Sequence, residues 1–440
     1  MCKSRKNKKI YDKDFWYSLL RYPVDAYIKA SYQKIIFCNR ERIPKNAAVI
    51  FTPNHCDAQM DPLLVLAVNR DRKVFVARAD VFKKPALRKL LTFFKMLPIN
   101  RIRDGIRSVT AVGDTINIAI EVLENNVAFC ILPEGTHRPM HSLLPIGKGV
   151  ARIACGAYEA MGDDNPVYIV PFGVEYGDYY RFRSTAMANV GEPFNVSEYI
   201  ASQQREGISE RYIMEGIRQQ IKERLQELIV YIDDNDEQYE AVWELAKLHS
   251  GQVPKLRIKE RFKANKDIIS RINRFRENDP QKASTLLDRA DELRERRLKS
   301  RISINAIHRK RPLLAAILGT LALIPGIPLF LIMGAASLPV WALSEVLCSK
   351  FEDRAFHNSV RCVVTLVLWT LLYLIEVVLL FCFVPCWKWA LAGAIILLPA
   401  PFFVYDFFEF VRVLASYWRI VFNRRLRNDY KELKNELKNI

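Results

Sequence analysis

The sequence lacks several features that would assign it early to a class. Its nine cysteines form no CxxC pair and show no metal-site spacing with the six histidines, so we interpret them as reduced packing residues. It has no internal repeat and no low-complexity tract, which argues against a repeat array and a disordered chain. The first ten residues are polar and basic, and the first apolar patch is too interrupted for a cleavable signal, so we expect none.

Length and charge leave two kinds of partner open. A chain of 440 residues exceeds one hydrophobic core, so we expect at least two structural units. The net charge of +18 is concentrated in residues 3–9, 255–311 and 412–438. Basic stretches of this kind bind nucleic acid or anionic lipid. The apolar C-terminal part favours a lipid bilayer, and we expect no nucleic-acid partner.

Three nearly uncharged segments predict a membrane-integral C-terminal region. They are residues 313–347, 363–385 and 389–408. The two later segments are long enough to cross a hydrocarbon core of roughly 30 Å as helices. Pro325-Gly326-Ile327-Pro328 interrupts the first segment, which is consistent with a re-entrant or tightly bent hairpin and with three or four crossings.

Charged residues around these segments predict their orientation. Lys350, Arg354 and Arg361 flank one loop, whereas Lys388 lies between two tryptophans in the next. By the positive-inside rule, the first loop and the basic tail face the cytoplasm, and an even number of crossings fits best. The large hydrophilic portion before Leu313 is then also cytoplasmic.

The middle of the sequence predicts a layered α/β domain. Short β-branched runs alternate with longer helical patterns, as in a sheet covered by helices. The predicted strands are 48–52, 73–77, 96–100, 127–132 and 167–174, and the predicted helices are 61–68, 85–94, 109–124 and 147–161. Sites in such sheets usually lie at strand ends.

The remaining composition divides the chain into five parts. Residues 14–37 have aromatic and basic residues in helical spacing, typical either of a helix in the membrane interface or of one packed on the domain. Four charged helical patterns cover 209–232, 235–249, 253–275 and 280–301, and this surface either lies on headgroups or is simply solvated. The predicted parts are 1–44, a basic amphipathic interfacial region; 45–200, the α/β domain; 201–311, a charged helical linker domain; 312–410, a transmembrane region of a hairpin plus two helices; and 411–440, a basic cytoplasmic tail.

A histidine at a strand exit is the first candidate for chemistry. Asn54-His55 follows the apolar run 48–51, and Asp61 lies six positions after the histidine. A neutral imidazole can take a hydroxyl proton, and a carboxylate fixes its tautomer and stabilises the imidazolium. Asp61 is the candidate partner and Asp57 is its close rival. Cys56 is a weaker candidate as a nucleophile, because adjacency in sequence does not bring it to the histidine.

Two further blocks carry groups that suit a phosphate. Arg101 ends the block Leu97-Pro98-Ile99-Asn100-Arg101, and a guanidinium offers a planar fork of donors to a phosphate monoester. Glu134, Gly135, Thr136 and Arg138 lie in a turn after an apolar strand, where glycine allows the chain to pass close to a ligand. Gly147 and Gly149 then open a helix whose N-terminal amides, together with Lys148, attract an anion.

Taken in order, these blocks and Val170-Pro171 resemble the PlsC-type glycerolipid acyltransferases, the glycerol-3-phosphate and 1-acylglycerol-3-phosphate acyltransferases, over roughly residues 45–200. The resemblance implies that His55 is the catalytic base and Asp61 its partner. It also implies that Arg101, Glu134, Gly135 and Arg138 bind the phosphate-bearing acceptor. Five residues separate His55 from Asp61 where the family commonly has four, a spacing similar to a subgroup that includes fungal glycerol-3-phosphate acyltransferases.

A second departure concerns the phosphate contact. His137 intervenes before Arg138, so Arg138, His137 and Lys148 all remain candidates for it. We predict a membrane-bound enzyme that transfers an acyl group from acyl-ACP or acyl-CoA to glycerol-3-phosphate or its monoacylated form, with no metal or organic cofactor. The alternatives are another lysolipid or an amino-acid lipid as acceptor, or a non-enzymatic membrane scaffold with a basic linker. The sequence leaves the oligomeric state open.

Overall fold

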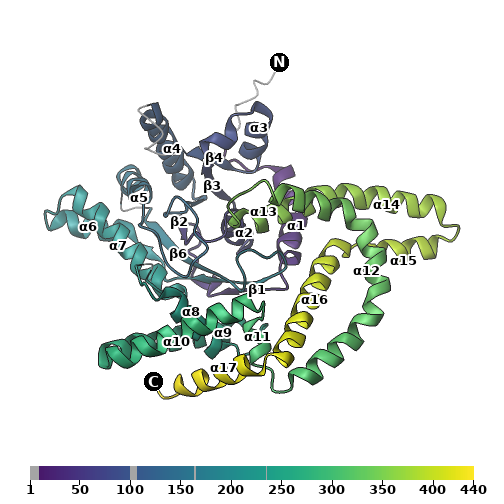
Figure 1. Cartoon of the computed structure of the whole chain (residues 1–440). Coiled ribbons are helices and arrows are strands. Elements are labelled where there is room, and N and C mark those ends of the chain that lie inside the picture. The colour runs from purple at the N-terminus through teal and green to yellow at the C-terminus, as the bar shows by residue number, and fades with distance from the viewer. Residues whose placement is uncertain (1–8, 100–106, 163–164, 234) are drawn as a thin grey trace. The chain divides into compact units, whose positions relative to one another are not determined.

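The computed structural model describes residues 9–99, 107–162, 165–233 and 235–440. They form two compact units (Figure 1). The described residues of the first unit fall within 9–29, 35–179 and 186–229, and those of the second within 30–34, 180–185 and 230–440. The sequence predicts a boundary at residue 200, but the first unit continues to Ile229 because α6 (Val196–Arg205) and α7 (Glu210–Leu228) pack on α5 (Lys148–Met161) and β6 (Val167–Tyr176).

The first unit is built on one mixed sheet. Its strand order is β1-β7-β6-β2-β5-β3-β4, with β8 paired to β6. The strands are β1 Lys34–Cys38, β2 Ala48–Pro53, β3 Lys73–Arg78, β4 Met96–Ile99, β5 Ala128–Cys130, β6 Val167–Tyr176, β7 Thr185–Val190 and β8 Phe194–Asn195. β2 pairs in parallel with β5 and β6, and all six of its residues are buried, as expected for a central strand covered on both faces.

Helices cover this sheet. They are α2 Met60–Ala67, α3 Pro85–Phe93 and α4 Arg107–Glu124, with α5, α6 and α7 following. α4 and α5 approach closely at Gly156, where an added Cβ would lie 2.7 Å from Ile120 Cδ1. Together with the helical region that follows, this sheet confirms the predicted fold class, a layered α/β domain followed by helices. Each of the five predicted strands and four predicted helices of the domain has a counterpart in the structure.

The N-terminal segment differs from the expected helix over 14–37. α1 spans Phe15–Ala30, and Lys34–Cys38 forms strand β1 at the sheet edge. The run Ile35-Ile36-Phe37 explains the change, because β-branched and aromatic side chains suit a pleated surface. α1 buries Tyr17 but leaves Phe15 and Trp16 73% and 65% exposed, so it has both a packed face and an exposed aromatic face.

The second unit begins with charged helices that share a buried ionic cluster. The helices are α8 Tyr239–Ser250, α9 Ile258–Asn278, α10 Pro280–Lys299 and, from the C-terminal end, α17 Arg424–Glu436. Glu244 is fully buried and accepts hydrogen bonds from Arg297 Nε and Nη2 at 2.7 and 2.8 Å and from Tyr430 Oη at 2.7 Å. Burial opposes ionisation of Glu244, but Lys247 and Arg297 outweigh it and lower its pKa to about 2. The cluster therefore ties α8, α10 and α17 together.

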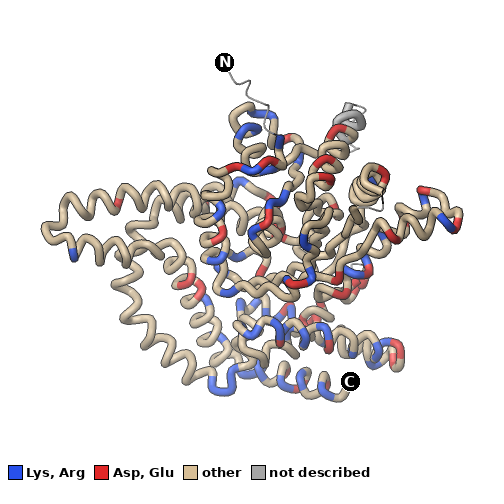
Figure 2. The backbone as a smooth tube through the Cα atoms, turned by 180° about the vertical axis from the view of Figure 1, so that it is seen from behind, with Lys and Arg blue, Asp and Glu red and all other residues tan. Residues whose placement is uncertain are grey.

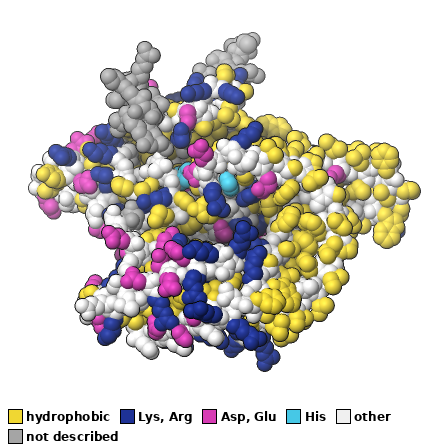
Figure 3. Space-filling model, viewed as in Figure 1, with side chains coloured by type: hydrophobic (Ala, Val, Ile, Leu, Met, Phe, Trp, Pro, Cys, Tyr) yellow, Lys and Arg dark blue, Asp and Glu magenta, His cyan; other side chains and the backbone are white. Residues whose placement is uncertain are grey.

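The rest of the second unit contains the apolar helices. α11 spans Ile304–Ile307, and α12 spans Pro312–Cys348. The helix Ala355–Phe383 consists of α13 Ala355–Val364, a π-helical turn at Thr365–Trp369 and α14 Thr370–Phe383. α15 Trp387–Leu397 and α16 Ala400–Phe422 are bent by 50° at their junction. Charged residues are sparse along these helices in Figure 2, and apolar side chains cover them in Figure 3.

The structure corrects the predicted membrane region in two respects. Residues 313–347 lie in one helix, α12, and not in a hairpin, although Pro325, Pro328 and Pro339 are inside it. A proline removes a single N–H donor, whereas leaving a helix inside a bilayer exposes many unsatisfied groups. Within the described residues, two helices are long and apolar enough to cross a membrane, or three if the bent α15–α16 pair is one span. The structure therefore offers two or three candidate spans, against the three or four crossings expected from the sequence.

Candidate active site

The end of strand β2 positions the histidine. β2 and β6 are in parallel register with Pro53 opposite Phe172, so β6 continues past the end of β2 as far as Tyr176. Asn54 uses this overhang: its Oδ1 accepts a hydrogen bond from Val174 N at 2.6 Å, and its Nδ2 donates to Val174 O at 3.1 Å. The buried asparagine therefore pins the chain to β6 one residue before His55.

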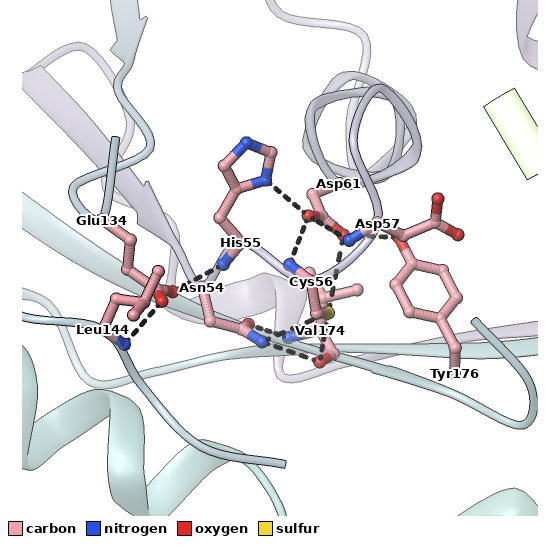
Figure 4. A network of polar contacts seen from close by, with 9 residues as sticks. All are labelled: Asn54, His55, Cys56, Asp57, Asp61, Glu134, Leu144, Val174 and Tyr176. Carbon is pink, nitrogen blue, oxygen red and sulfur yellow. Dashed lines mark hydrogen bonds and ion pairs between the residues drawn. The ribbon is translucent and has the colours of Figure 1, made fainter. Parts of the chain in front are cut away.

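Asp61 is the carboxylate that contacts His55. Its Oδ2 lies 2.9 Å from His55 Nδ1 and accepts the main-chain N–H groups of Cys56 and Asp57 at 2.8 and 2.9 Å. Its Oδ1 accepts the hydroxyl of Tyr176 at 2.8 Å. Figure 4 shows this network, with the Asp57 carboxylate pointing away from the imidazole. Four nitrogen and oxygen donors, and the Cys56 thiol at 3.8 Å from Oδ1, surround the Asp61 side chain, which is fully buried.

A tight turn brings Asp61 back to His55 across five intervening residues. Met60 N donates to Asp57 O at 2.7 Å, and α2 begins at Met60. Ala58 takes a positive φ of 26° within this turn, a conformation that L-residues rarely adopt. Asp61 then lies in the first turn of α2, where the helix dipole favours a negative charge.

This geometry leaves one nitrogen of His55 able to accept a proton. A carboxylate opposite Nδ1 favours the neutral tautomer with its proton on Nδ1, which leaves the lone pair on Nε2. Figure 4 shows Nε2 pointing away from the network. The His55 side chain is 14% exposed, which leaves the ring edge open to a reactant while the rest of the ring is enclosed. An imidazolium formed at Nε2 would be stabilised by Asp61.

Glu134 clamps two backbone segments instead of facing outward. Its Oε1 accepts His55 N at 2.7 Å, and its Oε2 accepts Leu144 N at 2.8 Å. Burial raises the pKa of Glu134 to about 7, opposed by these two N–H groups. Both oxygens are thus engaged with the protein, whereas the sequence motif implied contact with the acceptor. The geometry points to a positioning role.

The turn after β5 surrounds the histidine. Arg138 N donates to His55 O at 3.0 Å, and Arg138 Nη2 donates to Ser142 Oγ at 2.8 Å. The rings of His55 and His137 have centroids 5.4 Å apart and planes at 67°. Gly135 has φ +68°, and Gly147 donates to Pro133 O at 2.7 Å, an approach so close that an added Cβ would lie 3.1 Å from that oxygen.

The remaining predicted site residues are less enclosed. Thr136 lies in the turn and Lys148 at the first position of α5, and both are exposed. Within the described part of the chain, neither forms a hydrogen bond or ion pair with His55 or Asp61. Arg101 lies outside the described residues.

Cys56 is unsuited to nucleophilic catalysis. It is buried next to Asp61. Burial, followed by the charges of Asp61, Glu175, Asp57 and Glu134, holds the pKa of its thiol well above the usual range. Because the thiolate is the reactive form, Cys56 stays a packing residue.

Sequence reasoning missed two contributions from β6. Tyr176 holds Asp61, and Glu175 lies 3.3 Å from His141 Nδ1 in a second histidine–carboxylate pair. The available signal was the length of the β6 run, which extends past the end of β2 and so places residues beside the loop that follows β2. Among the described residues, no group of three or more His, Cys, Asp or Glu side chains is arranged to hold a metal ion.

Comparisons with known proteins find relatives among acyltransferases. Residues 34–175 match the family model described as Acyltransferase. The chain is 31% identical over 114 residues to glycerol-3-phosphate O-acyltransferase 1 of Saccharomyces cerevisiae, which is 26% of this chain but only 15% of that protein's length. It also has a likeness to the solved structure of the 1-acyl-sn-glycerophosphate (LPA) acyltransferase PlsC of Thermotoga maritima, at 20% identity and a TM-score of 0.33, covering 47% of this chain and 80% of that one.

Proposed function

We propose that this chain, whose residues 34–175 match the Acyltransferase family model, transfers an acyl group from acyl-ACP or acyl-CoA to the hydroxyl of glycerol-3-phosphate or 1-acylglycerol-3-phosphate. The observation that carries the proposal is the pair His55 Nδ1 and Asp61 Oδ2 at 2.9 Å, with Nε2 directed outward. The name of the yeast relative supports glycerol-3-phosphate as the acceptor.

In the proposed reaction, His55 Nε2 takes the proton of the acceptor hydroxyl, and the hydroxyl oxygen attacks the thioester carbonyl. The tetrahedral intermediate collapses with cleavage of the C–S bond, and the imidazolium returns its proton to the leaving thiolate. The products are an ester and a free thiol, without a covalent acyl-enzyme. Asp61 stabilises the imidazolium, and main-chain amides or nearby donors stabilise the oxyanion.

Besides a base, the proposed reaction needs groups that bind the phosphate of the acceptor. We assign its recognition to Arg101, Thr136, Arg138 and Lys148, with His137 as a further candidate because its ring adjoins that of His55. Glu134 and Gly135 shape the turn that carries these groups. The apolar helices of the second unit support membrane association, and we propose that the catalytic domain faces the cytoplasm, as the positive-inside rule predicts.

Product analysis by mass spectrometry tests this function. Membranes carrying the wild-type chain are supplied with an acyl thioester and either glycerol-3-phosphate or its monoacylated form. His55→Ala should reduce the product by roughly 10²- to 10⁴-fold, the usual contribution of a general base. His357→Ala, in the second unit, is the matched control and should leave product formation unchanged. Product that persists in His55→Ala would eliminate His55 as the base.

The same assay separates the alternatives. Product from another lysolipid or an amino-acid lipid, and from neither glycerol acceptor, would keep the reaction but change the substrate. The scaffold alternative predicts no His55-dependent product from any acceptor. The scaffold alternative also predicts that neutralising the exposed lysines of α9 abolishes binding to its partner. An acyltransferase should retain lipid acylation after the same change.

A further inference from the structure

A basic pocket lies where the chain enters α12, wholly within the second unit. It has a volume of about 480 Å³ and is formed by the segment before α12, the first residues of α12, the end of α16 and the start of α17. Four of its lining residues are cations, Lys310, Arg311, Arg424 and Arg427. Figure 2 shows the basic stretch at the entry to α12. The catalytic histidine has no part in this pocket.

The cations of this pocket lack protein counter-charges. No lining residue is acidic, and among the ion pairs of the described residues none involves these four side chains. The carboxylates of α17 are engaged elsewhere, since Asp429 pairs with Arg296 and Glu432 with Arg289. Like charges around one pocket repel one another, so an anion at this place relieves their repulsion.

The pocket is held in shape by one of its own arginines. Arg427 Nη2 donates to the carbonyl oxygens of Arg309 and Lys310 at 3.1 and 2.9 Å, which fixes the segment before α12 against α17. Arg427 Nε is buried and has no hydrogen-bond partner among the described residues. The same side chain also lines the pocket, so this fixed arginine presents a positive charge there.

Apolar groups and interface residues border the cations. Leu313 and Leu314 line the pocket and are 50% and 45% exposed at the start of α12. Tyr417 accepts a hydrogen bond from Arg309, and Trp418 donates to Thr320 Oγ1. Tyrosine and tryptophan favour the boundary between membrane and water. The N-terminal amides of α12 add a positive dipole end at the same level.

From this arrangement, we propose that the pocket binds the headgroup of an anionic phospholipid, with the phosphate among Lys310, Arg311, Arg424 and Arg427 and the acyl chains along Leu313 and Leu314. A free phosphate shares the charge but would not use the apolar side. The lipid is bound without being consumed, because the pocket holds no histidine or carboxylate. It would anchor the junction of α12, α16 and α17 at the membrane surface.

Native mass spectrometry of the full chain in a neutral detergent tests the proposal. The probe is dioleoylphosphatidylglycerol, which is neither substrate nor product of the proposed reaction, and dioleoylphosphatidylcholine is the neutral comparison. The double variant Lys310→Gln/Arg424→Gln should bind phosphatidylglycerol roughly 30-fold more weakly than wild type. The matched variant Arg425→Gln/Lys431→Gln removes two exposed cations of α17 that do not line the pocket. It should bind phosphatidylglycerol like wild type.

Three results would overturn the proposal. Equal weakening in both double variants would mean that only overall charge matters. Equal binding of the two lipids would remove the requirement for an anion. Displacement of the lipid by millimolar inorganic phosphate would assign the site to a free oxyanion. A thermal unfolding curve of each variant shows whether it is folded, and if the first double variant unfolds, Arg311→Gln alone should weaken binding about 5-fold.

Discussion

Replacing Asp61 by asparagine separates the charge of the proposed dyad from its shape. An asparagine can keep its oxygen toward the imidazole and the two main-chain N–H groups at 2.8 and 2.9 Å. Its amide nitrogen would then face Tyr176 Oη, which can turn from donor to acceptor. We therefore expect Asp61→Asn to fold with His55 still oriented, but without the negative charge that stabilises the imidazolium.

The size of the effect follows from the contact distance. His55 Nδ1 and Asp61 Oδ2 are 2.9 Å apart, so the two charge centres lie about 4 Å apart, where a pair of unit charges is worth about 4 kcal/mol at an effective dielectric constant of about 20. Because the imidazolium exists only after proton abstraction, this energy is lost from the transition state. The value of kcat should fall by about 10³-fold with little change in KM.

The assay measures kcat and KM for acyl transfer from an acyl thioester to the accepted glycerol substrate, with equal amounts of folded protein in detergent. Asp57→Asn is the matched control, since this carboxylate is also fully buried and lies in the same turn. It should cost less than about 10-fold, in line with a local hydrogen bond. The reasoning is refuted if Asp61→Asn keeps more than a tenth of the wild-type kcat, or if Asp57→Asn is the more damaging change.

Two further predictions concern stability and pH, each measured by thermal unfolding in detergent. Burial raises the pKa of Glu134 from 4.5 to about 7. Between these two values the folded chain holds a proton that the unfolded chain has released, so wild type should lose at most about 3 kcal/mol of stability as pH rises from about 5 to about 8. The variant Glu134→Gln should lack this loss. A difference in stability between wild type and Glu134→Gln that does not change with pH would contradict this prediction. Burial, followed by the charge of Arg21, lowers the pKa of Lys73 from 10.5 to about 7. Between pH about 7 and about 10 the folded lysine is neutral while the unfolded lysine still holds its proton, so wild type should gain at most about 5 kcal/mol of stability as pH rises through this window. Lys73→Met should remove the gain, and an equal gain in that variant would refute the assignment.

Much of the α/β domain was predictable because its strands are central. β2 and β6 are buried on both faces, so their sequences are continuous apolar runs between turn signals. β7, in contrast, reads Thr-Ala-Met-Ala-Asn-Val, and its small and polar residues carry little strand signal. β1 was hidden at the end of a helical pattern. The missed strands lie on the β6 side of β2, where antiparallel pairing depends on the rest of the sheet.

Only the contacts between residues close in sequence could be predicted for the candidate site. The spacing between His55 and Asp61 is short enough for a turn to close, and the strand before it fixes where the turn begins. Tyr176 is 115 positions from Asp61, and only the register that sets Pro53 opposite Phe172 brings it there. Glu134 shows a different limit, because a motif can indicate that a carboxylate matters without showing that both its oxygens hold main-chain N–H groups.

The long apolar helix α12 shows why helix-breaking residues are a poor guide to helix ends in this region. Pro325-Gly326-Ile327-Pro328 would end a helix in water, where the freed carbonyl groups bind solvent. Beside a bilayer the freed groups have no water, and continuing the helix satisfies more of them than turning back does. Packing adds to this preference, since Met333 and Val340 of α12 share a buried cluster with Ala400 and Val404 of α16. A proline therefore marks a bend in an apolar segment more reliably than it marks the segment's end.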